Sequence, residues 1–165
     1  MNPSKPTVEQ ARAYIYSIDF SMIVHKMVKY DKWLREDADK TCQLYRNFLF
    51  LKKKYQDTQI KVPPSLDIDE FWHYHILDTE KYHRDCQAIF GHYLHHHPTY
   101  PGPEGTVKLE RLAVAFEQLQ EIHKSEFGES ICATRTKRSP LINTILVSKL
   151  GKIIYDTLSR NRETK

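Results

Sequence analysis

Glycine and cysteine are both scarce in this sequence, with five glycines and three cysteines in 165 residues. Turn-dense β folds rely on glycine for turn conformations with positive φ, so its scarcity favours helices. Cys42, Cys86 and Cys132 are odd in number, scattered and free of any Cys-x-x-Cys pair. This pattern excludes a disulfide scaffold and indicates a reducing compartment. The chain is long enough to bury a hydrophobic core without such crosslinks.

Long apolar runs are also missing. No run approaches the roughly 20 residues that a membrane-spanning helix needs, and the first residues, MNPSKPTVEQ, lack the apolar stretch of a signal peptide. We therefore expect a cytoplasmic protein without a transmembrane segment. The net charge of +4 is uneven, because residues 134–165 carry eight basic and two acidic side chains while the remainder is slightly acidic. The tail is thus a distinct basic unit.

Apolar side chains recur at helical spacing along most of the chain, which predicts an all-α fold: a single bundle-like domain of about five or six helices. The expected helices cover residues 7–19, 20–32, 33–55, 67–90, 106–127 and 140–158. The first begins with a Thr7/Gln10 capping box, and the prolines of KVPPS separate the third from the fourth. We expect residues 1–133 to form the helical domain. Residues 134–165 form a basic linker and an amphipathic helix that packs on it.

The fourth segment carries its own start, break and stop signals. Asp67 and Glu70 resemble a capping pair at its beginning. Asp78 and Thr79 are both good N-cap residues, so the segment divides there into two helices or continues through. Gly91 is placed to end the helical pattern as a left-handed C′ residue.

Seven of the nine histidines lie in one stretch, DEFWHYHILDTEKYHRDCQAIFGHYLHHHP, residues 69–98. Asp69 and His73 are four residues apart, so a helix places them on one face one turn apart, as a two-ligand clamp for a metal ion. After the stop at Gly91 the chain can return, and His96 in the middle of the HHH run is our third candidate ligand. Zinc or non-haem iron suits such a carboxylate and histidine set.

His75 has two interpretations. On an intact helix it lies about 200° from His73, so the two cannot bind one ion together. It falls instead among apolar residues, where a buried neutral imidazole bonded to a hydroxyl or carbonyl is as plausible as a ligand. A break near Leu77 would let His75 join the site as a fourth ligand. The candidate metal ligands are therefore Asp69, His73, His75 and His96.

Other chemistry finds little support in the sequence. There is no His-Glu-x-x-His zinc motif, no Gly-x-Ser-x-Gly nucleophile motif and no glycine-rich phosphate loop. Cys86 with His83 three residues before it could form a nucleophile and base. A cysteine on the central apolar line is more often an inert core thiol, however. We expect the remaining histidines of the stretch to be solvated or part of the core.

The same stretch resembles the central signature of the glycine-rich domain-containing protein-like family. The resemblance covers about a fifth of the chain. The matching positions are Asp69, Trp72, His73, His75, Leu77, Tyr82, Cys86, Gly91 and His96. It implies a stand-alone, mostly helical domain, without the glycine-rich region of larger relatives and without an implied catalytic activity. We expect no nucleic-acid binding, because the body is slightly acidic and lacks RNP and zinc-finger signatures.

Three functions follow from these observations. The first is a small helical binding module with a His/Asp metal site, and the second is a metal-dependent enzyme, using zinc or non-haem iron, in which Asp69, His73 and His96 leave one position open. The third is an interaction protein that acts through its basic C-terminal helix. That helix would contact an unknown protein partner, a second copy of the chain or an anionic membrane surface. The sequence leaves open whether the protein is an enzyme.

Deletion of residues 139–165 distinguishes the roles of the tail. If its apolar stripe packs on the domain, the shortened protein should lose several kcal/mol of unfolding free energy in urea, since each buried Leu or Ile contributes about 1.5–3 kcal/mol. If the tail is an interaction arm, stability should stay nearly unchanged while self-association or liposome binding is lost. Retention of both stability and association would contradict both roles.

Overall fold

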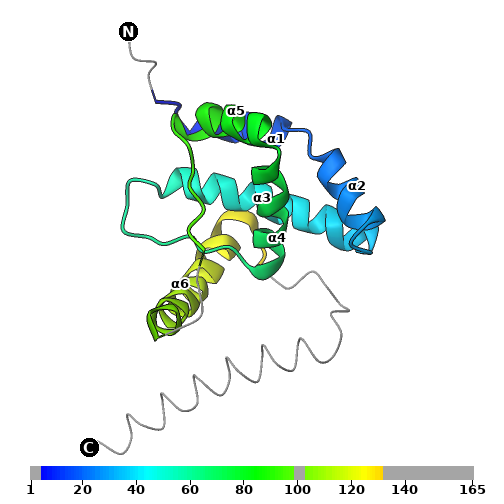
Figure 1. The fold of residues 1–165 in the computed structure, drawn as a ribbon. Helices are drawn as coiled ribbons and strands as arrows, with labels where there is room; N and C mark the ends of the chain where they lie inside the picture. The colour runs from blue at the N-terminus through cyan, green and yellow to red at the C-terminus, as the bar shows by residue number, and fades with distance from the viewer. Residues whose placement is uncertain (1–4, 99–102, 132–165) are drawn as a thin grey trace, which may run out of the picture. The chain divides into compact units, whose positions relative to one another are not determined.

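The computed structural model describes residues 5–98 and 103–131. They contain six helices: α1 (Val8–Ser17), α2 (Ser21–Lys29), α3 (Arg35–Lys54), α4 (Leu66–Leu77), α5 (Thr79–Phe90) and α6 (Pro103–Phe127) (Figure 1). These residues include no strand, which confirms the all-α prediction. None of their helices is both long and apolar enough to cross a membrane. The chain divides after residue 134, and the expected C-terminal helix lies outside the described residues.

Helix α3 is the centre of this domain. It contacts α1, α2 and α4, while α5 contacts both α1 and α4. Four consecutive α3 residues, Phe48, Leu49, Phe50 and Leu51, are each at most 2% exposed. Successive helical residues point about 100° apart, so four in a row can be buried only if neighbours cover the helix on every side. Near its end, α6 supplies part of this cover, because Phe127 packs edge-on against Phe50.

The helix boundaries follow local signals, with one correction. The predicted capping box of Thr7 and Gln10 is confirmed at the start of α1. Helix α4 begins earlier than expected, because the Ser65 hydroxyl, and not Asp67, caps it by accepting the N–H of Ile68. The chain breaks between α4 and α5 at Asp78, which resolves the alternative left open by the sequence.

Two boundaries depend on left-handed backbone. Gly91 ends α5 with φ of 75°, as predicted. Lys32 has φ of 59°, a conformation that ordinary side chains disfavour, and it lies in the connection between α2 and α3, where the sequence predicted the division between residues 20–32 and 33–55. Helix α6 starts at Pro103, three residues before the predicted start, which fits the preference of proline for the first helical turn.

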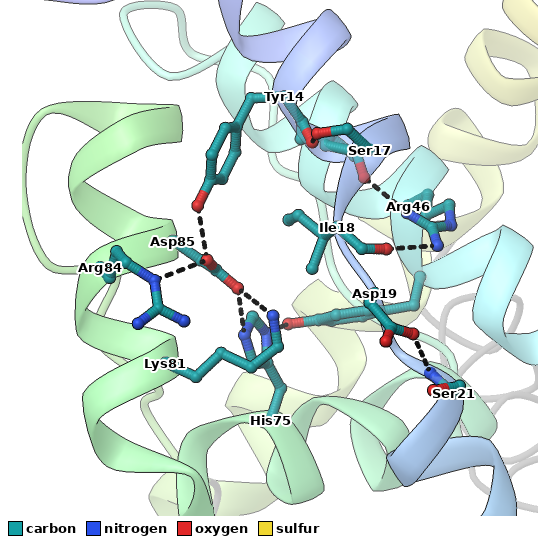
Figure 2. A network of polar contacts seen from close by, with 12 residues as sticks. Tyr14, Ser17, Ile18, Asp19, Ser21, Arg46, His75, Lys81, Arg84 and Asp85 are labelled. Atoms are coloured by element: carbon teal, nitrogen blue, oxygen red, sulfur yellow. Dashed lines mark hydrogen bonds and ion pairs between the residues drawn. The ribbon is translucent and has the colours of Figure 1, made fainter.

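A buried carboxylate, Asp85, joins the helices that surround the core. Figure 2 shows Tyr14, His75 and Lys81 converging on it. The Tyr14 hydroxyl donates to Oδ1 over 2.7 Å, and the His75 Nε2 and Lys81 Nζ lie 3.0 Å from Oδ2. The other nitrogen of His75 lies 2.8 Å from the Tyr45 hydroxyl. The network therefore ties α5 to α1 and α4, and through His75 to α3.

The protonation states of this network follow from burial and hydrogen bonding. Burial alone would raise the pKa of Asp85, but hydrogen bonds from His75, Tyr14 and Lys81 outweigh it and lower the pKa to about 2. Burial lowers the pKa of His75 in spite of the neighbouring carboxylate. At neutral pH, a neutral imidazole therefore donates its Nε2–H to ionised Asp85 and accepts the Tyr45 hydroxyl at Nδ1.

Replacement of Asp85 tests how much this network stabilises the fold. Asp85→Asn should lower the unfolding free energy at pH 7 by about 2–3 kcal/mol, the scale of lost hydrogen bonds to a buried charged group. The Asp85 pKa is depressed from 3.8, so the wild-type advantage should be complete above about pH 4 and shrink as pH falls toward 2. Urea unfolding across this range measures both effects.

The matched control is Asp39→Asn, which removes a carboxylate from an exposed i, i+4 pair with Arg35. Water screens that pair, so its loss should leave the urea midpoint nearly unchanged. Equal stability of the Asp85 and Asp39 variants at pH 7 would contradict a central role for the network.

Candidate metal-binding site

Asp69, His73 and His96 come together at the surface of α4. Asp69 and His73 lie one turn apart on this helix, and His96 belongs to the segment that follows α5. The Nε2 of His96 is 3.0 Å from Asp69 Oδ1, and the Nε2 of His73 is 3.7 Å from Asp69 Oδ2. One donor atom from each of the three residues lies within 4.8 Å of the other two. The helical spacing and the returning segment thus produce the approach that the sequence suggested.

The return of His96 begins with a glycine. Gly91 reverses the chain in a left-handed conformation, with φ of 75°. An added Cβ at this position would meet Pro6 Cδ at 3.2 Å, closer than most such contacts in proteins. Both the backbone angle and the close approach of the N-terminal segment therefore favour glycine where the chain turns back toward α4.

A polar clasp then fixes the returning segment. The Tyr82 hydroxyl donates to the Leu94 carbonyl over 2.5 Å and accepts the indole N–H of Trp72 over 2.9 Å. Residues of α4 and α5 thus hold the backbone two positions before His96. Trp72 and Tyr82 thus serve to position the segment.

Aromatic rings complete the setting of the candidate ligands. The His96 ring packs edge-on against Trp72 at 4.8 Å and against His73 at 4.7 Å, centroid to centroid. The His96 side chain is 19% exposed and that of His73 is 51% exposed. The cluster therefore has a packed side formed by Trp72 and an open side at His73.

His75 does not join this cluster, although our predicted metal set included it. Its side chain is 1% exposed, and its two nitrogens pair with Tyr45 and Asp85. The physical reason is helical geometry: His75 is two residues after His73, so its side chain points to the opposite face of α4. The break at Asp78 comes after His75 and leaves that geometry intact.

The sequence analysis missed two features of the buried polar structure. Asp85 shares the apolar arc of α5 with Tyr82, Cys86 and Ile89, and a charged residue at such a position could have signalled a buried network. His123 is also buried, with its nitrogens 3.1 Å from Asn47 Nδ2 and 2.5 Å from the Glu129 carbonyl.

Cys86 does not have the environment of a nucleophile. It is buried, and that burial raises the pKa of its thiol, which disfavours the reactive thiolate. Its potential base His83 is exposed. This environment supports the structural role that the sequence analysis preferred for Cys86.

The donor set of the cluster suits a borderline divalent ion. One carboxylate oxygen and two imidazole nitrogens are common ligands of zinc and non-haem iron. Zinc–nitrogen bonds of about 2.0–2.1 Å put tetrahedral ligand atoms about 3.3–3.5 Å apart. The donor atoms of Asp69, His73 and His96 lie within 4.8 Å of one another, so they would move closer together on binding zinc.

A comparison with known protein families shows which family the chain belongs to. The model of one family matches residues 10–147, most of the sequence. The chain belongs to the UCP032817-like family. The match includes the whole cluster of Asp69, His73 and His96, and the family description names no metal, substrate or reaction. No curated protein and no solved structure matches the chain. The resemblance to the glycine-rich domain-containing protein-like family stays a prediction.

Proposed function

We propose that this UCP032817-like protein is a small helical binding module that holds one divalent metal ion, zinc or iron, through Asp69, His73 and His96. The observation that carries the proposal is the convergence of one carboxylate and two imidazoles, with donor atoms within 4.8 Å of one another. Two of these ligands come from one helix and the third from a segment 23 residues later along the chain. Such a site links separate parts of the fold.

The surroundings of the three side chains favour binding. The clasp of Tyr82 with Leu94 and Trp72 fixes the backbone near His96, so less conformational entropy is lost when a metal is bound. The Asp69 carboxylate lies 3.0 Å from His96 Nε2 and 3.7 Å from His73 Nε2, so the three donor groups already face one another. Metal ligands must be deprotonated, so a metal ion and protons compete for these three side chains.

The open side of the cluster at His73 is compatible with the alternative function, a metal-dependent enzyme. Three protein ligands with a solvent-filled fourth position are typical of catalytic zinc sites, whereas structural sites are closed by four. The His73 side chain is half-exposed, which gives room for a water molecule or an external ligand. A metal-bound water that exchanges freely would favour the enzyme, and a closed site would favour a structural role.

The proposed location is the reducing cytoplasm. Cys42 and Cys86 are both free cysteines, which fits the compartment that the cysteine pattern suggested. Interaction through the basic C-terminal helix remains a separate prediction, because that helix lies outside the residues that the structure describes.

Substitution of the candidate ligands tests the metal site. His73→Gln and His96→Gln should each weaken zinc binding by about 10-fold or more, since even changes beyond the direct ligands have effects of this size. Glutamine keeps most of the side-chain volume, so the circular dichroism spectrum should stay helical. Isothermal titration of the untagged protein with Zn²⁺, in competition with a chelator of known affinity, measures the change.

The matched control is His25→Gln, which removes an exposed imidazole from α2. This variant should bind zinc as tightly as the wild type. Unchanged affinity in both His73→Gln and His96→Gln would overturn the proposal, and an equal loss in all three variants would indicate nonspecific binding to surface histidines.

A further inference from the structure

The segment that delivers His96 carries further imidazoles on its other side. His96 contacts Asp69 and Trp72 of α4, whereas His95 and His97 on either side of it are exposed. The rings of His95 and His97 lie 6.3 Å apart, centroid to centroid, and are tilted by 37°. On an extended segment, residues two apart point to the same side. His95 and His97 therefore lie on one side of the segment, and His96 lies on the other.

We propose that His95 and His97 form a second metal site, a two-histidine chelate on the outer face of this segment. Two imidazoles bound to one ion, with metal–nitrogen bonds of about 2.0–2.1 Å, have ring centroids about 4.5 Å apart at a 90° bond angle and about 5 Å apart at a tetrahedral angle. The observed 6.3 Å is longer than that spacing, and because both side chains are exposed, their rings can rotate toward a shared ion. Water molecules complete the coordination, because the two histidines supply only two ligands.

The backbone of this chelate is held on both sides. Before it, Tyr82 donates to the Leu94 carbonyl. After it, the ammonium group of Lys108 on α6 donates to the carbonyls of His97 and Pro98, over 3.1 and 3.0 Å. These bonds restrict the segment before any ion binds, which reduces the entropy lost on binding. The positive charge of Lys108 repels a bound cation. Its two carbonyl partners and screening by solvent reduce this repulsion.

A row of rings continues along the same face. Tyr93 lies 4.9 Å from His95 and 6.1 Å from His83, centroid to centroid. Tyr93 therefore packs against the His95 ring of the chelate. His83 belongs to α5, so the row extends from the returning segment onto the neighbouring helix.

The two sites differ in charge and in selectivity. The cluster of Asp69, His73 and His96 contains a carboxylate, whereas the chelate of His95 and His97 has neutral ligands only. Neutral imidazoles discriminate against calcium and magnesium, which prefer oxygen, and favour Ni²⁺ and Cu²⁺ according to the ordinary order of divalent affinities. The chelate has two protein ligands and not three, so we expect its affinity to be at least about 10-fold weaker.

Titration of the untagged full chain with Ni²⁺ tests this second site. The wild type should bind two ions in two resolved steps in isothermal titration. His95→Gln with His97→Gln should remove the weaker step and leave the tighter one unchanged. The matched control is His25→Gln with His92→Gln, which removes the same number of exposed imidazoles and should keep both steps.

The outcomes separate the two metal proposals. A wild type with one step, or a His95/His97 double variant that still binds two ions, would overturn the chelate. So would a control variant that loses the weaker step, because any pair of surface histidines would then suffice. His73→Gln with His96→Gln should abolish the tighter step alone, so failure of the first site leaves the weaker step as a separate readout.

Discussion

The buried Asp85 carboxylate is the interaction on which the arrangement of the helices depends. A charge in a helical core is costly unless hydrogen bonds compensate it. Here Tyr14, His75 and Lys81 supply those bonds from three helices, and His75 passes the connection on to Tyr45 of α3. Because each donor must reach one small group, the network specifies the relative positions of α1, α3, α4 and α5 more narrowly than apolar packing alone.

The candidate metal site depends on this arrangement through helix α4. One side of α4 carries His75 into the network, and its outer side carries Asp69 and His73. The contact between α4 and α5 places Trp72 beside Tyr82, and their hydrogen bonds hold the segment that leads to His96. The buried network thus fixes the two helices, which place Asp69 and His73 of α4 beside His96, a residue 23 positions further along the chain.

Local signals made much of this predictable. Helical periodicity predicted the helices, Thr7 and Gly91 marked two of their ends, and the i, i+4 spacing of Asp69 and His73 suggested a shared face. The return of His96 followed from the glycine stop and the histidine-rich run after it. Each of these inferences uses residues that are close together along the chain, where helix geometry alone determines which side chains meet.

The remaining features depend on contacts between distant residues, which periodicity does not contain. The pairing of His75 with Tyr45 joins residues 30 apart, and that of Tyr14 with Asp85 joins residues 71 apart. A sequence shows that His75 lies on an apolar face but not which partner it meets there. For this reason the choice between a ligand and a buried hydrogen-bonded imidazole needed the three-dimensional structure.

The central claim, that Asp69, His73 and His96 bind one metal ion, is tested most directly by anomalous diffraction at the zinc edge, from crystals of the untagged protein with one equivalent of Zn²⁺. We predict a peak about 2.0–2.2 Å from an oxygen of Asp69 and from one nitrogen each of His73 and His96. An ion bound elsewhere, with no peak among these three side chains, would contradict it.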